Sequence, residues 1–392
     1  MYHLATLCSA DFQLLPFYYL FSSEIMKDWY KIDNIGEIDS PALVVYPERI
    51  QGNIDLALKI AGNKEKLRPH VKTNKMGEVC SMMLNAGIKK FKCATIAEAE
   101  MLAAVNARDV LLAYQPVGPK INRLIKLIKK YSNTVFSCLV DNIENARSIN
   151  RLCKESNICL DIYIGLNIGM NRTGIKPDKA VTLVNDILQL SNLRIKGLHG
   201  YDGHIHDEDI NERQRKADIS FALTEKVYKE IAPLFSYPLV MVMGGTPTFP
   251  NHINRHNSEC SPGTFVFWDW GYKHMLEDLP FEYAAALISR GISVVDEKHI
   301  CIDLGHKSVA AENPLPRVHF LNASEARPIA QSEEHLVLQV ADSKDYKIGD
   351  VLYGIPVHIC PTVALYEKAF VIENNTKTSE WKVVARNRFI NI

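Results

Sequence analysis

Three features that would place a protein in a specialised class are missing from this sequence. No run of about 18 or more apolar residues occurs in its 392 residues, so we predict no membrane-spanning helix. The 45 basic residues equal the 45 acidic residues and form no basic stripe, which argues against a nucleic-acid partner. The length and the 47% hydrophobic content instead suit a globular protein with a large core and two domains.

The sequence also lacks the regular cysteine spacing of a disulfide-rich secreted protein. Its nine cysteines are odd in number and scattered, which favours a reducing compartment, and we predict a cytoplasmic protein. Residues 1–25 are rich in Leu, Phe and Tyr, but they have no basic n-region and include Asp11, so they do not resemble a signal peptide. We interpret them as a disordered extension or as residues before a true start at Met26.

Strand-like and helix-like segments alternate from about residue 41 to residue 275. The β-favouring runs are 42–46, 67–72, 90–95, 110–115, 135–140, 159–166, 194–201 and 239–243. Amphipathic helical patterns lie between them, as at 121–131, 180–190 and 220–231. This alternation predicts an α/β fold with a TIM-type (β/α)8 barrel. A doubly wound open sheet is the alternative, weakened because no GxGxxG turn follows the first strand.

The pattern changes after about residue 280, where short β-like runs recur between prolines and glycines without long helices. These runs predict a C-terminal antiparallel β domain. We therefore expect a barrel domain at 26–275 and a β domain at 276–392. Residues 39–47 are expected to include the crossover from the second domain into the barrel.

Polar residues follow the predicted barrel strands, where barrel enzymes place their active sites. Lys72, Thr95, Gln115, Tyr201 and the stretch 167–172 all lie at such strand ends. A lysine walled by protein can lose its proton near neutral pH and attack a carbonyl, which makes Lys72 a candidate Schiff-base lysine. The alternative for Lys72 is an ordinary solvated surface lysine.

Two glycine turns and one His-x-Cys pair add to this candidate site. Gly244, Gly245 and Thr246 begin one turn, and Gly263 and Thr264 end the other; such turns allow backbone amides to approach a phosphate. The alternative is a pair of tight structural turns.

His358 and Cys360 lie two positions apart, so in an extended segment their side chains would share one side and could bind one metal ion. Two protein ligands leave coordination positions open, as in catalytic sites. A buried histidine and a buried cysteine are the alternative.

Four motifs together resemble the D-threonine aldolase and D-serine dehydratase family. They are Arg-Pro-His-Val-Lys-Thr-Asn-Lys at 68–75, Gly-Gly-Thr-Pro-Thr at 244–248, Pro-Gly-Thr-Phe-Val-Phe-Trp-Asp at 262–269 and His-Ile-Cys-Pro-Thr at 358–362. The resemblance implies an alanine-racemase-like N-terminal barrel, a C-terminal β domain and a homodimer. It also implies pyridoxal 5'-phosphate and a divalent metal ion, either Zn, Mn or Mg.

The resemblance also implies roles for individual residues. Lys72 looks like the lysine that carries the cofactor, Tyr201 like the tyrosine near it, and Arg172 like the arginine near the pyridine ring. The residues that look like the phosphate and cofactor contacts are Gln115, Gly244, Gly245, Thr246, Gly263 and Thr264. His358 and Cys360 look like the metal ligands.

The sequence departs from the family in two places. Asn74 stands where many relatives have a histidine, and the stretch after Tyr201 carries His204 and His206 close to Asp207. We take His206 or His204 as the candidate base, which leans toward an aldolase.

Several activities remain open. As an aldolase, the protein would cleave D-threonine to glycine and acetaldehyde. As a D-serine dehydratase, it would form pyruvate and ammonia, with Lys72 removing the Cα proton. An amino-acid racemase, which needs no metal, and a non-catalytic cofactor carrier are further alternatives.

Overall fold

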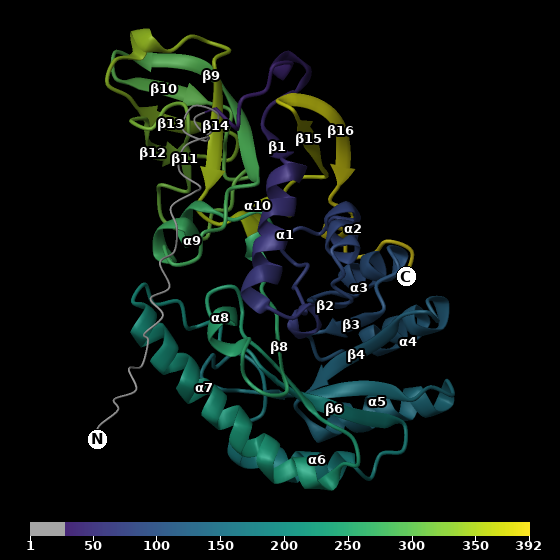
Figure 1. Ribbon diagram of the computed structural model, residues 1–392. Helices are drawn as coiled ribbons and strands as arrows, with labels where there is room; N and C mark the ends of the chain where they lie inside the picture. The colour runs from purple at the N-terminus through teal and green to yellow at the C-terminus, as the bar shows by residue number, and fades with distance from the viewer. Residues whose placement is uncertain (1–27) are drawn as a thin grey trace, which may run out of the picture.

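The structure is a computed structural model that describes residues 28–392, so the predicted extension at 1–25 lies outside the described residues. It contains one parallel and one mostly antiparallel sheet (Figure 1). The helices are α1 (Pro47–Ala61), α2 (Gly77–Asn85), α3 (Ile96–Ala104), α4 (Pro119–Lys130), α5 (Ile143–Glu155), α6 (Pro177–Ile187), α7 (Ile210–Ile231), α8 (Phe249–His252), α9 (Trp270–Met275) and α10 (Ile359–Val363). Within residues 28–392 no helix is both long and apolar enough to cross a membrane.

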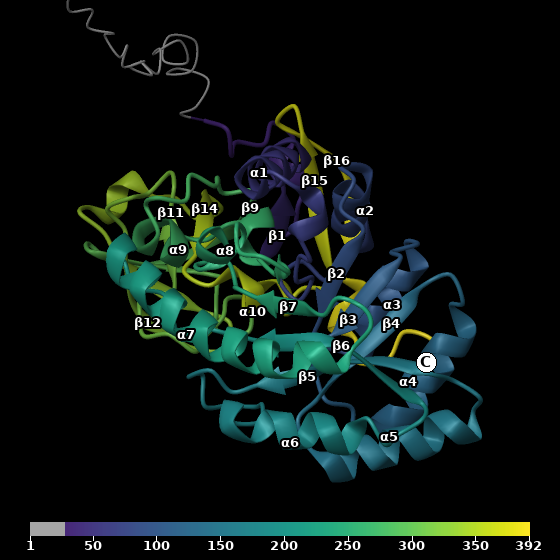
Figure 2. The same ribbon diagram turned by 60° about the horizontal axis from the view of Figure 1, so that its bottom comes forward.

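Seven parallel strands form most of the barrel. In spatial order they are β2 (Lys90–Cys93), β3 (Asp109–Leu112), β4 (Val135–Val140), β5 (Leu160–Leu166), β6 (Leu193–Gly200), β7 (Val240–Met243) and β8 (Ser258–Cys260). Residues 67–71 close the ring between β8 and β2: Leu67 bridges Cys260, His70 bridges Lys92, and both bridges are parallel. The predicted eight-stranded α/β barrel is confirmed. Figure 2 shows α5, α6 and α7 along the outer side of its strands.

One predicted barrel strand was wrong. Residues 42–45 form β1 (Ala42–Val45), which pairs with β15 (Lys368–Glu373) and β9 (Ala285–Asp296) in the second sheet. The eighth place in the barrel belongs to β8, a strand that the sequence did not predict. The four residues of β1 are all buried, so they carry no alternation that assigns them to a sheet. β8 is a short Ser-Glu-Cys segment without an apolar run.

The second sheet confirms the predicted C-terminal β domain. Its spatial order is β12-β13-β10-β9-β1-β15-β16, and β14 joins β9 to β11. The remaining strands are β10 (His299–Ile302), β11 (Val318–Phe320), β12 (Arg327–Gln331), β13 (Leu336–Gln339), β14 (Val351–Pro356) and β16 (Thr376–Lys382). All its pairings are antiparallel except that of β1 with β15. From β1 the chain crosses to the barrel through α1, as expected of residues 39–47.

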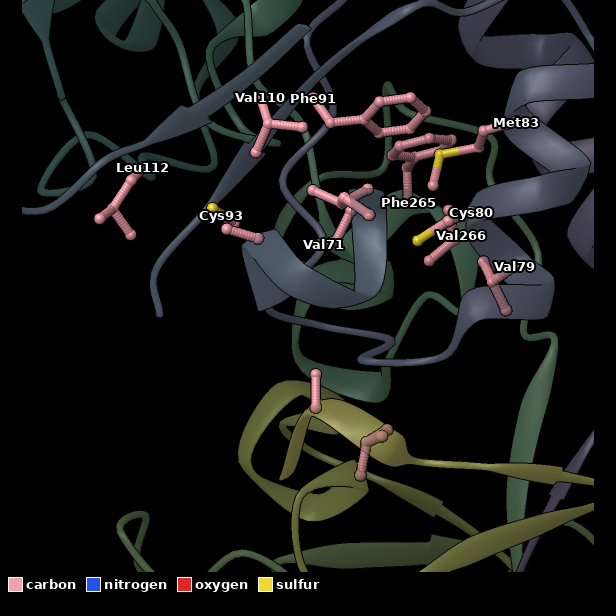
Figure 3. Packing of buried hydrophobic residues seen from close by; sticks show 14 of the residues in the cluster. Val71, Val79, Cys80, Met83, Phe91, Cys93, Val110, Leu112, Phe265 and Val266 are labelled. Atoms are coloured by element: carbon pink, nitrogen blue, oxygen red, sulfur yellow. The ribbon is translucent and has the colours of Figure 1, made fainter. Parts of the chain in front are cut away.

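Side chains of β2 alternate between the two faces of the barrel wall. Phe91 and Cys93 belong to the core between strands and helices, where they lie with Val110 and Met83 (Figure 3). Because successive strand residues point to opposite faces, Lys92 points into the barrel. A separate buried cluster is formed by side chains that point into the barrel from neighbouring strands, as Lys92 does. Its members are Leu111, Leu139, Tyr163 and Val242.

Candidate active site at the carboxyl end of the barrel

Lys72 lies in a turn that follows the barrel-closing segment. Its backbone amide donates to His70 Nδ1 over 3.3 Å, and Lys75 N donates to Val71 O over 3.0 Å, which fixes the turn. The segment itself is held on both sides, because Arg68 N donates to Cys260 O and Val71 N to Lys92 O. The Lys72 side chain is exposed, so a ligand at the mouth of the barrel can reach its amine.

The barrel segments around Lys72 carry two imidazoles, His70 in the closing segment and His199 on β6, and a second lysine, Lys92 on β2. Lys92 Nζ is 3.5 Å from His199 Nε2, and both side chains are buried. Burial, and then the charge of Lys72, lower the pKa of Lys92 to about 7. Burial, and then the charge of Lys92, lower the pKa values of His70 and His199. Sequence reasoning missed Lys92 and His199, although a lysine between two apolar residues of a strand was a usable signal.

Tyr201, just after β6, lies close to the predicted residue Arg172 and to Lys92. Its ring centroid is 5.3 Å from the guanidinium carbon of Arg172 and 5.3 Å from Lys92 Nζ. The ring also lies against two glycines: a Cβ on Gly203 would be 2.3 Å from it, and one on Gly245 would be 3.3 Å away. The structure therefore brings Tyr201, Arg172 and the first glycine turn together.

The two glycine turns contact each other directly. Thr246 Oγ1 accepts hydrogen bonds from Gly263 N over 3.0 Å and from Thr264 N over 3.1 Å. Gly244 has φ +70°, and its carbonyl accepts from Ser261 N over 3.0 Å. Ser261 Oγ is buried and has no hydrogen-bond partner within the described chain. A glycine-lined turn with an unsatisfied hydroxyl suits a phosphate group, which accepts several hydrogen bonds.

The His-x-Cys pair reaches this site from the second sheet. Cys360 Sγ is 3.0 Å from Thr73 Oγ1, next to Lys72, and 3.4 Å from Thr264 Oγ1 of the second glycine turn. The expected extended geometry is wrong at one residue: His358 is extended, but Cys360 lies in the first turn of α10. The short helix therefore brings the thiol to the barrel mouth, at the junction of the two sheets (Figure 1).

The charges of this pair are coupled. Burial opposes protonation of His358, but contact with Cys360 outweighs it and raises the pKa of the imidazole to about 9. Burial likewise opposes ionisation of Cys360, yet His358 lowers the pKa of its thiol. His358 Nδ1 is 2.6 Å from Glu312 Oε1. A carboxylate on the far ring nitrogen is the usual support of a metal-binding histidine, so the pair fits a divalent ion.

No group of three or more metal-ligating side chains occurs anywhere in residues 28–392. The donor set at this position is therefore limited to one imidazole and one thiol, with the remaining coordination positions left to other ligands. That set suits zinc by ligand softness, and it does not exclude the harder ions.

Other predicted residues lie apart from this group. Gln115 Oε1 accepts from Asp141 N over 2.8 Å, tying the ends of β3 and β4 together, and Thr95 caps α3. His204 lies against Gly169, where an added Cβ would be 2.6 Å from Nε2. His206 is exposed and makes no side-chain hydrogen bond to the described residues.

A buried acid and histidine, also missed by sequence reasoning, hold the loop that carries Tyr201. Asp202 Oδ2 is 2.8 Å from His252 Nε2, and Asp202 Oδ1 accepts from Thr248 Oγ1 over 2.9 Å. Burial opposes ionisation of Asp202, but His252 and Thr248 together lower the pKa of its carboxyl group. These contacts fix Tyr201 relative to the first glycine turn.

Comparison with protein families and curated proteins agrees with this architecture. Residues 45–269 match the model of the alanine racemase N-terminal domain, and residues 284–372 match a putative serine dehydratase domain. The chain is 23% identical to a D-threonine aldolase from Arthrobacter sp over 90% of its length and 94% of that protein. It is 25% identical to 3-hydroxy-D-aspartate aldolase from Paracoccus denitrificans over 90% of its length and 93% of that protein.

Solved structures show the same fold. D-threonine aldolase from Filomicrobium marinum superposes with a TM-score of 0.82 at 25% identity, covering 90% of this chain and 97% of that one. D-threo-3-hydroxyaspartate dehydratase from Delftia sp. superposes with a TM-score of 0.78 at 20% identity, covering 88% of this chain and 97% of that one. The first comparison spans both sheets of the protein.

Proposed function

The chain belongs to the alanine racemase N-terminal domain family, and we propose that it is a pyridoxal-phosphate- and metal-dependent lyase of the D-threonine aldolase type. Its substrates would be D-β-hydroxy amino acids, with D-threonine cleaved to glycine and acetaldehyde. One observation carries the proposal: Cys360 Sγ lies 3.0 Å from Thr73 Oγ1, beside Lys72, and 3.4 Å from Thr264 Oγ1 of the glycine turn. The candidate lysine, phosphate turn and metal pair therefore meet at one place.

In this proposal the barrel, residues 26–275, holds the cofactor. Lys72 Nζ would attach it, the turns at 244–246 and 263–264 would bind its phosphate, and Tyr201 with Arg172 would contact its ring. Pyridoxal phosphate supplies an electron sink for bond breaking at the substrate Cα. Lys72 Nζ would also be the group that exchanges a proton at the substrate Cα.

The β domain, residues 276–392, would contribute the metal ligands His358 and Cys360, with Glu312 orienting the imidazole. A divalent ion there supplies a Lewis acid that lowers the pKa of the β-hydroxyl group. We keep zinc, manganese and magnesium as candidates. We also propose a homodimer, as in the related family, which sedimentation of the purified protein would measure.

His206, or His204 as the second candidate, would accept the proton of the β-hydroxyl group. Both lie on the loop between β6 and α7, and the Tyr201 end of that loop is fixed by Asp202. His206 is exposed to solvent. It can act as a base only if the loop between β6 and α7 moves so that the imidazole comes within hydrogen-bond distance of the substrate hydroxyl group.

A second candidate function is dehydration of a D-β-hydroxy amino acid. Two solved variants of D-threo-3-hydroxyaspartate dehydratase replace a histidine and, two positions further on, a cysteine by alanine, and the cysteine variant is in the metal-free form. The same pair at the same spacing occurs here as His358 and Cys360. A D-serine dehydratase from Dictyostelium discoideum is also 22% identical to the chain over 88% of its length.

One product analysis separates these activities. The purified protein is incubated with pyridoxal phosphate, a divalent metal salt, and D-threonine, D-serine or D-3-hydroxyaspartate. Glycine identifies aldol cleavage, a 2-oxo acid identifies dehydration, and the enantiomer identifies racemisation. Formation of none of these products would refute the lyase proposal.

Two substitutions assign the roles. Lys72→Ala should abolish the visible absorption band of the lysine-bound cofactor, whereas Lys89→Ala, at an exposed lysine, should leave it intact. His206→Ala should reduce glycine formation more than 2-oxo acid formation if it is the hydroxyl base, with exposed His335→Ala as the control. Equal losses in both reactions would remove His206 from that role.

A further inference from the structure

Lys92 is a buried lysine whose position the proposed function leaves unexplained. Its strand neighbours Phe91 and Cys93 face the helices (Figure 3), so its own side chain points into the barrel. Only 2% of its surface is exposed. A buried ammonium group is stable only where an anion or several acceptors compensate for the lost water.

The described residues offer Lys92 no anionic partner. Its hydrogen-bond contact is His199 Nε2 at 3.5 Å, a neutral ring because burial lowers the pKa of that imidazole. The charge of Asp202 acts on Lys92, but both carboxylate oxygens of Asp202 already accept hydrogen bonds from other side chains. Within residues 28–392 no carboxylate forms an ion pair with Lys92 Nζ.

The charge state of Lys92 therefore depends on what enters the site. Burial, followed by the positive charge of Lys72, lowers the pKa of Lys92 to about 7, so near neutral pH both forms are populated. An anion beside Nζ would favour the charged form. Lys92 O accepts from Val71 N, next to Lys72, over 2.9 Å, and Lys92 Nζ lies 5.3 Å from the ring centroid of Tyr201. An anion beside Lys92 Nζ would therefore lie close to the atom that reacts with Lys72.

We propose that Lys92 binds the anionic ring oxygen of pyridoxal phosphate, an inference that rests on the proposed function. In this cofactor the phenolate oxygen is on the ring carbon next to the one that carries the aldehyde. An oxygen so placed lies beside the carbon that Lys72 attacks, while the phosphate arm is on the ring carbon at the other side of the aldehyde-bearing carbon and would face the glycine turns. Lys92 is then a cofactor-binding residue with a defined chemical partner.

A cofactor analogue tests this assignment directly. The cofactor-free wild type and Lys92→Met are titrated with pyridoxal phosphate and with its 3-O-methyl ether, whose ring oxygen cannot carry a charge. The wild type should bind pyridoxal phosphate roughly tenfold or more tightly than the ether, the difference typical of a charge-assisted hydrogen bond. Lys92→Met should lose this preference, and Lys89→Met, at an exposed lysine, should keep it.

Each outcome decides the matter. If Lys92→Met retains the preference, or weakens both ligands equally, Lys92 does not contact the ring oxygen and the inference is wrong. If the wild type binds neither ligand, the proposed function itself fails. Lys92→Gln, which keeps a polar group in the barrel, serves as the second variant if circular dichroism shows that Lys92→Met does not fold.

Discussion

Replacing Arg68 by methionine should measure how the segment that carries Lys72 is held in the barrel. Arg68 is 1% exposed, and its guanidinium carbon lies 6.0 Å from the ring centroid of Tyr163. Its Nε donates to Glu259 Oε2 over 2.7 Å, and its Nη1 and Nη2 donate to the two oxygens of Asp109 over 2.6 and 3.1 Å. The side chain thereby joins the closing segment to β8 on one side and to β3 beyond β2 on the other.

The magnitude follows from what the substitution leaves behind. Breaking a buried ion pair by removing one partner lowers the free energy of unfolding by about 3–5 kcal/mol, because the remaining charge is uncompensated. Glu259 keeps a second partner, Lys90 Nζ, at 2.7 Å, and the Asp109 side chain is 35% exposed. Because Lys90 and solvent partly compensate the two remaining carboxylates, we expect the free energy of unfolding to fall by about 3 kcal/mol, the lower end of that range.

The assay is urea unfolding of the cofactor-free protein, followed by circular dichroism. Arg147→Met is the control, because Arg147 also donates a hydrogen bond to a carboxylate, that of Glu144 over 2.6 Å, but both side chains are exposed, by 59% and 71%. An exposed pair contributes about 0–1 kcal/mol. A loss below about 1 kcal/mol for Arg68→Met, or equal losses for both variants, would contradict the reasoning.

Three further predictions concern the site. Gly263→Ala should weaken binding of pyridoxal phosphate in equilibrium dialysis, because its Cβ would be 2.7 Å from His70 O, whereas Gly52→Ala, with no atom within 4 Å, should not; equal binding by the two variants would exclude a tight turn at the phosphate. The pKa of Lys92 is lowered from 10.5 to about 7, so the unfolded chain binds more protons between these values. The unfolding free energy of the cofactor-free wild type, minus that of Lys92→Met, should therefore rise from pH 7 to pH 10, with a slope of at most about 1.4 kcal/mol per pH unit; a flat difference would refute the buried-charge argument. Exhaustive chelation should remove lyase activity while the visible band of the bound cofactor remains, and a divalent salt should restore activity; full activity after chelation would eliminate the metal role.

Much of this architecture could be predicted from local patterns. Apolar runs alternating with amphipathic helices indicated a barrel, and the same runs predicted that Lys72 and the first glycine turn follow barrel strands. These features depend on residues close to one another in the chain, because the periodicity of apolar residues within a short segment distinguishes a strand from a helix. The motifs also indicated the family that the comparisons confirmed.

The errors have one physical origin. β1 joined the second sheet because Val44 pairs with Ala286 and Phe370, partners more than 200 residues away. The side chain of Gln115 is also positioned by another segment, because its Oε1 accepts from Asp141 N at the end of β4, and its predicted contact with the cofactor stays a prediction. Such strand pairings and hydrogen bonds join segments that are distant in the chain. They therefore cannot be predicted from the residues of either segment alone.

The sequence by itself determined that a lysine, two glycine turns and a His-x-Cys pair belong to a barrel with an added β domain. Only the tertiary structure decided that Cys360, on the short helix that follows β14, contacts Thr73. It also decided that Lys92 is buried next to His199 and forms no ion pair with a carboxylate of the described residues. Local periodicity sets elements and strand ends. The distances between side chains far apart in the chain follow from the closure of the barrel and the packing of the second sheet against it.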